Sequence, residues 1–255
     1  MAPRGNSSKS TLDAPFLKRI ALDPSKTDRE LFPFKTLPYL VEDFELEFES
    51  AVTVVVGENG SGKSTLIEAI AQAAGFSAQG GAHHHQTGMA ETENALTNAL
   101  RLSWLPKVNR GFFFRAESFF NFQTYIDTAH VESGWPAPGM HKRSHGEAFL
   151  QAFEDRLHAR QRAIYILDEP EVALSPQRHL AFLRILREWQ VSGQVQAIIA
   201  THSPMLMSLP DITLLSLDGG HIRRVEPEQT EHVRVMRRFL SDPAGMMRDL
   251  FEDIG

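Results

Sequence analysis

Cysteine is absent from this chain of 255 residues. Disulfide bonds, thiolate metal sites and cysteine nucleophiles are therefore excluded. The composition suits a reducing compartment, and we expect a cytoplasmic protein. Long apolar runs are also missing, since none approaches the roughly 18–20 residues that a membrane-spanning helix needs. We accordingly predict no transmembrane segment.

Positive net charge is lacking as well, because the formal charge at pH 7 is -6. This balance argues against a generally cationic nucleic-acid-binding protein. A local basic cluster is present at Arg234, Arg237 and Arg238. Such arginines usually form a solvated helix surface, and the alternative is contact with a phosphate backbone.

Residues 1–13 contain Arg4 and Lys9 with no apolar stretch behind them, which excludes a secretory signal. Their Ser, Gly, Pro and Asn content is typical of a flexible segment. We predict a flexible leader over residues 1–25 and a single domain over residues 26–255.

Hydrophobic periodicity predicts a chain that begins with strands. Phe44, Leu46 and Phe48 alternate with glutamates, as in a half-buried strand. Val52–Val56 is a continuous β-branched run, typical of a strand buried on both faces. The helical spacing over Ser64–Ala74 ends at Gly75.

Further strands and helices alternate along the rest of the chain. Leu180, Leu183, Leu186 and Trp189 are expected to face inward from one of these helices. A helix followed by a strand edge is predicted over Thr92–Leu105. The other predicted strands are Gly111–Arg115, Ala163–Leu167, Gln194–Ala200 and Ile212–Leu217, and the helices are Glu147–Arg160 and Pro176–Gln190. The predicted fold class is α/β, with a mainly parallel sheet, helices on both faces and an antiparallel N-terminal β portion.

A glycine-rich loop lies between the buried strand Val52–Val56 and the helix after it. Its glycines let backbone N–H groups converge on a phosphate, and the helix points its positive end there. Lys63 would neutralise the β- and γ-phosphates, and the Ser64 hydroxyl would bind Mg²⁺. The predicted nucleotide-binding residues are Gly57, Glu58, Asn59, Gly60, Ser61, Gly62, Lys63, Ser64 and Thr65.

A second buried strand, Ala163–Leu167, leads into two carboxylates, Asp168 and Glu169. Asp168 is placed to bind Mg²⁺, and Glu169 to polarise the attacking water, the two tasks that in-line phosphoryl transfer requires. In a sequence without a glycine-rich loop upstream, an Asp-Glu pair after a strand would often belong only to a turn.

Thr201-His202-Ser203-Pro204 follows the next predicted strand. A lone histidine at a strand end is usually structural. Here the chain order brings His202 to the carboxyl edge of the sheet, beside the predicted nucleotide, which favours a catalytic role.

Ser144-His145-Gly146-Glu147 opens the predicted helix Glu147–Arg160. Ser144 and Glu147 form an S-x-x-E capping box. The same helix start, with Ser144 and Gly146, also suits an anion, and the two interpretations are compatible.

The order of these four motifs resembles that of ABC-type ATPases. More narrowly, the chain resembles small bacterial AAA/ABC-like ATPases, single-domain relatives of the RecF and SMC ATPase heads. The resemblance covers about residues 33–250, and the matching stretches are GENGSGKSTLIEAIA, FFFRAESFFN, SHGEAFL, YILDEPEVALSPQR, IIATHSP and FLSDP.

The resemblance implies a P-loop NTPase of the ABC/SMC-head type that binds ATP and Mg²⁺ and hydrolyses ATP. Ser144 and Gly146 resemble the residues that contact the γ-phosphate across a head-to-tail dimer, which implies an ATP-dependent homodimer. Glu117 occupies the place of a glutamine that contacts Mg²⁺ or water, and Gln123 is the alternative. In the family, a loop with an aspartate links the two nucleotide sites of the dimer, and Ser175 replaces that aspartate here.

Two aromatic residues and a histidine run stay open to two interpretations. Tyr39 or Phe34 either stacks on adenine or belongs to the core. His83–His85 is expected to be a solvated loop, because three consecutive histidines cannot converge on a metal without a further partner.

Three functions compete at this point. The first is an ATPase that acts in DNA repair, nucleic-acid handling or phage defence, with a nucleic-acid or protein partner. The second is the nucleotide-binding subunit of a membrane transporter, and the third is a slow nucleotide-sensing switch. The short segment between Glu117 and Ser144 leaves little room for a transporter-coupling subdomain, which favours the first.

Overall fold

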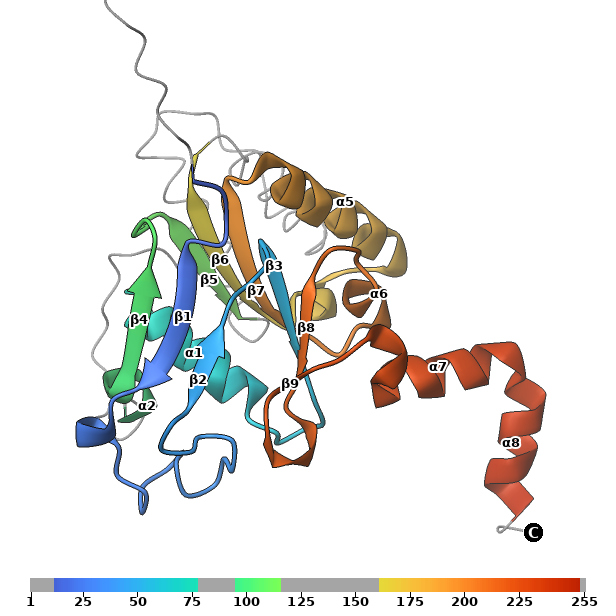
Figure 1. Ribbon diagram of the computed structural model, residues 1–255. Coiled ribbons are helices and arrows are strands. Elements are labelled where there is room, and N and C mark those ends of the chain that lie inside the picture. The colour runs from blue at the N-terminus through green and yellow to red at the C-terminus, as the bar shows by residue number, and fades with distance from the viewer. Residues whose placement is uncertain (1–11, 78–94, 116–160, 253–255) are drawn as a thin grey trace, which may run out of the picture.

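The computed structural model describes residues 12–77, 95–115 and 161–252, whose strands form two sheets (Figure 1). The smaller sheet is antiparallel, in the order β2-β1-β4, with β1 (Leu17–Leu22), β2 (Glu45–Glu47) and β4 (Leu100–Trp104). The larger sheet has the order β5-β6-β7-β3-β8-β9. Its strands are β3 (Val52–Val56), β5 (Gly111–Arg115), β6 (Ala163–Asp168), β7 (Val195–Ala200), β8 (Thr213–Ser216) and β9 (Arg223–Arg224).

The pairings within the larger sheet are parallel except for that of β9 with β8. The strands predicted from the sequence are confirmed to within one residue at each end. The central strand β3 lies between β7 and β8 and is buried along its whole length. Its β-branched residues suit a position covered on both faces.

The helices are α1 (Lys63–Ala73), α2 (Ala95–Ala99), α5 (Pro176–Ser192), α6 (Pro204–Met207), α7 (Glu231–Ser241) and α8 (Pro243–Phe251). Short 3-10 helices are η1 (Pro24–Lys26), η5 (Pro170–Ala173), η6 (Asp218–Gly220) and η7 (Pro227–Gln229). The predicted helix Glu147–Arg160 lies outside the described residues. In Figure 1, α7 and α8 project away from the sheets.

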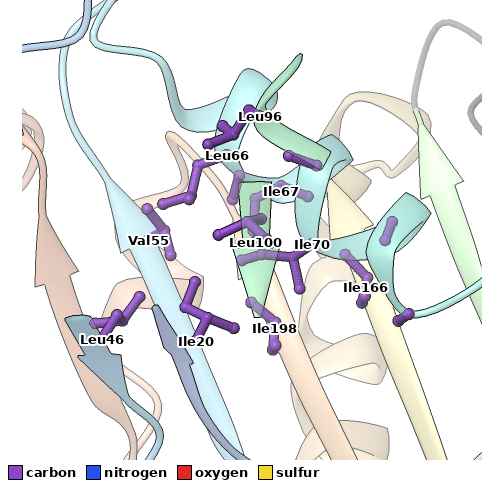
Figure 2. Packing of buried hydrophobic residues seen from close by; sticks show 14 of the residues in the cluster. Ile20, Leu46, Val55, Leu66, Ile67, Ile70, Leu96, Leu100, Ile166 and Ile198 are labelled. Atoms are coloured by element: carbon purple, nitrogen blue, oxygen red, sulfur yellow. The ribbon is translucent and has the colours of Figure 1, made fainter. Parts of the chain in front are cut away.

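The larger sheet is covered on both faces, as predicted. Alternate residues of β6 face opposite sides, so Tyr165 packs in a core cluster with α5. Ile166 packs in a second cluster with α1 and the small sheet. Figure 2 shows this second cluster, with Ile166, Ile198 and Ile70 among its members.

The inward face predicted for α5 is confirmed at Leu186 and Trp189 and is wrong at Leu180. In α5 the buried residues are Phe182, Ile185, Leu186 and Trp189, whereas Leu180 is 60% exposed. Leu180 precedes Phe182 by two residues, or roughly 200° around the helix, and therefore lies on the opposite side. Leu183 is partly buried at the edge of the core.

The predicted leader over residues 1–25 extends too far. Phe16 and Leu17 are fully buried at the start of β1, and Gln196 of β7 fixes this point. The Gln196 Oε1 atom accepts hydrogen bonds from the N–H groups of Phe16 at 2.8 Å and Leu17 at 2.7 Å. Its Nε2 donates to the Leu17 carbonyl at 2.9 Å. Residues 17–22 are thus part of the fold, and residues 1–11 lie outside the described residues.

Among the described residues, no helix combines the length and the apolar character that crossing a bilayer would require.

Candidate functional site

Four neighbouring parallel strands end at one edge of the large sheet. Asp168 ends β6, Thr201 follows β7, Gly57 follows β3 and Asp218 comes shortly after β8. In open α/β sheets ligands bind outside the carboxyl ends of the strands. The predicted glycine-rich loop, the carboxylate pair and the histidine motif therefore meet where a ligand is expected.

The loop between β3 and α1 has a backbone that demands glycine at its end. Gly62 has a φ of 90° and precedes the first residue of α1. A Cβ atom at Gly62 would lie 2.5 Å from Leu37 and 2.6 Å from the Tyr39 hydroxyl. The positive φ and the close contacts with Leu37 and Tyr39 both exclude a larger residue at position 62. The end of the loop therefore packs directly against the core.

Asp218 anchors the other half of the loop. Its Oδ1 accepts a hydrogen bond from the Glu58 N–H at 2.8 Å, and its Oδ2 accepts one from the Ser216 hydroxyl at 2.9 Å. In the sequence, Asp218-Gly219-Gly220 follows the predicted strand Ile212–Leu217 and is typical of a turn. Asp218 follows β8, which lies beside β3, and this neighbouring position brings it to the loop after β3.

Lys63 lies inside the loop and is only 5% exposed. Its Nζ donates to the carbonyl oxygens of Gly57 at 2.8 Å and Glu58 at 2.9 Å. Burial lowers the pKa of the Lys63 ammonium, and the carboxylates of Glu169 and Asp168 act in the opposite direction. The ammonium is thus held by two carbonyl oxygens at the start of the loop.

Ser64 and Asp168 lie in direct contact. The Ser64 hydroxyl donates a hydrogen bond to Asp168 Oδ1 at 3.1 Å, which joins the first turn of α1 to the end of β6. A hydroxyl and a carboxylate at this separation fit Mg²⁺, a hard cation that proteins commonly hold with one or two oxygen ligands together with phosphate and water. The predicted metal ligands are therefore side by side.

Glu169 has an unusual backbone. Its φ and ψ are 51° and 52°, the left-handed region, which costs a non-glycine residue about 1–3 kcal/mol. Its N–H donates to the Ala200 carbonyl at 2.9 Å, and Pro170 follows immediately. The side chain of Glu169 is 37% exposed. Such a residue at the end of a buried strand suits a catalytic base.

His202 follows β7 at the predicted carboxyl edge of the sheet, and its Nε2 lies 3.5 Å from Glu169 Oε1. Its backbone N–H and the Thr201 hydroxyl both donate to Glu171 Oε1, at 2.7 Å and 2.5 Å. Glu171 thus ties the turn after β6 to the turn after β7, a role that the sequence did not indicate. Burial, with nearby Lys63 and His232, lowers the pKa of His202, and Glu169 and Asp218 oppose that shift.

Several predicted residues lie outside the described residues: Glu117, its alternative Gln123, Ser144, Gly146 and the run His83–His85. Tyr39 and Phe34 are 4% and 5% exposed in the core beside α1. The Tyr39 hydroxyl donates to the Gly62 carbonyl at 3.1 Å. Of the two interpretations of these aromatic residues, the core is therefore confirmed.

The basic cluster on α7 is largely charge-balanced. Arg237 pairs with Glu228 at 3.0 Å, and Arg238 pairs with Asp249 at 2.8 Å. Arg234 is exposed. This pairing favours a solvated helix surface over a phosphate-binding patch.

Comparison with known proteins agrees with this geometry. Residues 34–98, which contain the glycine-rich loop and α1, match the family model of an AAA domain. Together with the sheet order, this match confirms an α/β P-loop NTPase fold. A search of curated proteins finds no match.

Solved structures with a similar fold include the SMC head domain from Thermotoga maritima, at 17% identity, covering 83% of this chain and 99% of that chain, with a TM-score of 0.40. Another is cbiO1 from Clostridium perfringens, part of the ABC transporter complex cbiONQ, at 15% identity, 93% and 100% coverage and a TM-score of 0.47. A putative metal-chelate type ABC transporter matches at 15% identity, 83% and 84% coverage and a TM-score of 0.46.

Proposed function

We propose that this P-loop NTPase, whose residues 34–98 match an AAA domain, binds ATP with Mg²⁺ and hydrolyses it to ADP and phosphate. The observation that carries the proposal is the direct contact between Ser64 and Asp168, with Glu169 next in the chain. One contact thus brings the phosphate-binding helix and the carboxylate pair together.

Each residue has a definite task in this reaction. The N–H groups of the loop and the Lys63 ammonium bind the β- and γ-phosphates. Ser64 and Asp168 would hold Mg²⁺, which would supply charge neutralisation at the phosphate oxygens. Glu169 accepts a proton from the attacking water as the water forms its bond to phosphorus and the bond to the β-phosphate oxygen breaks. A general base of this kind contributes roughly 10²–10⁴-fold in rate.

His202 completes the arrangement. Its Nε2 lies 3.5 Å from Glu169 Oε1, and the charge of Lys63 also acts on the ring. A γ-phosphate bound beside these groups would accept a hydrogen bond from Nε2 while Glu169 orients water. Such a donor stabilises the charge that develops as the bond breaks. Glu171 supports this position through the His202 backbone.

The proposal extends to assembly. By resemblance, Ser144 and Gly146 of a second subunit would contact the γ-phosphate, so ATP would lie between two copies of the chain. The nucleotide would then hold a homodimer together until hydrolysis removes the γ-phosphate. The ATPase would serve DNA repair, nucleic-acid handling or phage defence. In that role it would act on a nucleic acid or through a protein partner.

The test of the function is phosphate release from Mg-ATP by the purified protein, in parallel with Lys63→Ala. Release by the wild type and loss in the variant support an ATPase. Equal release by both would assign the activity to a contaminant. Gel shift with DNA at several salt concentrations then tests for a nucleic-acid partner. Binding through contacts to DNA phosphates should weaken steeply as the salt concentration rises.

A further inference from the structure

The two histidines His202 and His232 form a direct hydrogen bond near the nucleotide site. The Nδ1 atom of His202 lies 2.8 Å from Nε2 of His232, and the ring centroids are 4.9 Å apart. His202 follows β7, whereas His232 lies in the first turn of α7. The contact therefore connects the predicted catalytic histidine to a helix that the proposed mechanism has not used.

Only one of these two nitrogens carries the shared proton. Either His232 donates from Nε2 to the lone pair of His202 Nδ1, or His202 donates from Nδ1 to His232. In the first case a neutral His202 carries its proton on Nε2. In the second case a neutral His202 has a lone pair there.

The surroundings of His202 Nε2 select the first arrangement. This atom is shielded from solvent, makes no hydrogen bond within the described residues, and lies 3.5 Å from Glu169 Oε1. A lone pair facing a carboxylate is repelled, whereas an N–H is attracted. Lys63 and Asp218 also act on the charge of the ring, Glu171 accepts the His202 backbone N–H, and burial favours the neutral form of the ring.

We propose that His232 is a positioning residue that donates a hydrogen bond to His202 and holds it as the tautomer with the proton on Nε2, directed at Glu169 and the γ-phosphate position. This inference rests on the proposed function and assigns a second histidine to that site. A fixed tautomer matters because only an N–H at this nitrogen stabilises a developing phosphate charge.

The fold holds His232 in a defined position. Thr230 caps α7 by accepting the Val233 N–H at 3.4 Å, and its hydroxyl donates to the Pro227 carbonyl at 2.7 Å. Val233 is buried in the core, and Thr230 also contacts Met207 of α6. The first turn of α7 is thus fixed to the body of the domain, and the backbone that carries His232 is fixed with it.

The test compares two substitutions of similar size. His232→Gln keeps an N–H donor for His202 Nδ1, whereas His232→Leu keeps the volume and removes the donor. Loss of a residue that orients a functional histidine typically costs about 10–100-fold in activity. We expect this fall in kcat for His232→Leu, near wild-type kcat for His232→Gln, and an unchanged thermal shift with Mg-ATP in both. The exposed His221→Leu is the control.

Nitrogen NMR of histidine-labelled protein gives a readout that does not depend on hydrolysis. The His202 signals, assigned by their loss in His202→Asn, should show a protonated Nε2 and a bare Nδ1 in the wild type. His232→Leu should lose this fixed tautomer. A protonated Nδ1 in the wild type, wild-type kcat in His232→Leu, or an equal loss of kcat in both variants would overturn the proposal. If the wild type hydrolyses no ATP, the proposed function fails, and the NMR result still decides the tautomer.

Discussion

Ser64 Oγ lies 3.1 Å from Asp168 Oδ1, although 104 positions separate the two residues in the chain. The contact joins the helix that follows the glycine-rich loop to the strand that ends in the carboxylate pair. We expect Ser64→Ala to raise the Mg²⁺ concentration needed for half of the ATP-induced thermal shift, because one of the two proposed oxygen ligands is lost. Ser103→Ala, on the small sheet, should leave it unchanged. A Ser64→Ala curve that overlays the wild type would remove Ser64 from the metal site.

Lys63→Ala should abolish ATP binding without unfolding the domain. The ammonium is the main positive charge inside the loop, and its hydrogen-bond partners are loop carbonyls rather than core groups. Thermal melting with and without Mg-ATP measures this, with exposed Lys107→Ala as the control. A normal ATP-induced shift in Lys63→Ala would mean that the phosphate site is elsewhere.

Asp218→Ala should weaken ATP binding, because the Glu58 N–H loses its acceptor and the first half of the loop is released. Loss of a hydrogen bond to a charged acceptor costs about 1.5–3 kcal/mol, or roughly 10–100-fold in affinity if the whole loss appears in binding. Asp218→Asn keeps an oxygen acceptor at this position and should bind within a few-fold of wild type. Titration calorimetry with Mg-ATP separates the two variants, and equal affinities in both would show that Asp218 does not shape the loop.

Gln196→Leu should destabilise the fold by about 2–5 kcal/mol, since buried backbone donors at Phe16 and Leu17 and one carbonyl lose their partner. Denaturant unfolding followed by fluorescence measures the change. Gln177→Leu, on the exposed side of α5, is the control. A loss below about 0.5 kcal/mol, the range of ordinary surface changes, would show that β1 does not depend on this residue.

The sequence predicted the strands of the large sheet well because their signal is local. Fully buried strands are continuous apolar runs, and the glycine-rich loop is recognised from its own residues. Strand β1 was missed because its burial does not alternate strictly: the register with β4 shifts between Leu17 and Arg19, which places buried residues at 17, 20 and 22. A bulge of this kind interrupts the alternation of buried and exposed residues by which a strand is recognised in a sequence.

The residues of the site that sequence reasoning missed share a different cause. Asp218, Glu171 and His232 act through hydrogen bonds to distant parts of the chain, at Glu58, Thr201 and His202. A single carboxylate or histidine in a loop or on a helix surface carries no pattern of its own. Only the fold brings these groups to the edge where Asp168 and Glu169 were already expected.

Assembly gives a separate prediction. With Mg-ATP, Glu169→Gln should elute as a dimer in gel filtration with light scattering, and as a monomer with Mg-ADP, because unhydrolysed ATP keeps the proposed interface closed. Adding Ser144→Arg to Glu169→Gln should prevent the dimer while leaving ATP binding intact. A double variant that still dimerises would return Ser144 to the role of a helix cap.

The most direct test of the account is single-turnover hydrolysis of Mg-ATP by the wild type and by Glu169→Gln, with the surface variant Glu188→Gln as the control. Glu169→Gln keeps the shape of the side chain but cannot accept a proton from water. The account predicts that it binds ATP like the wild type and converts it to ADP roughly 10²–10⁴-fold more slowly, while Glu188→Gln matches the wild type. Conversion at the wild-type rate by Glu169→Gln would contradict the assignment of Glu169 as the base.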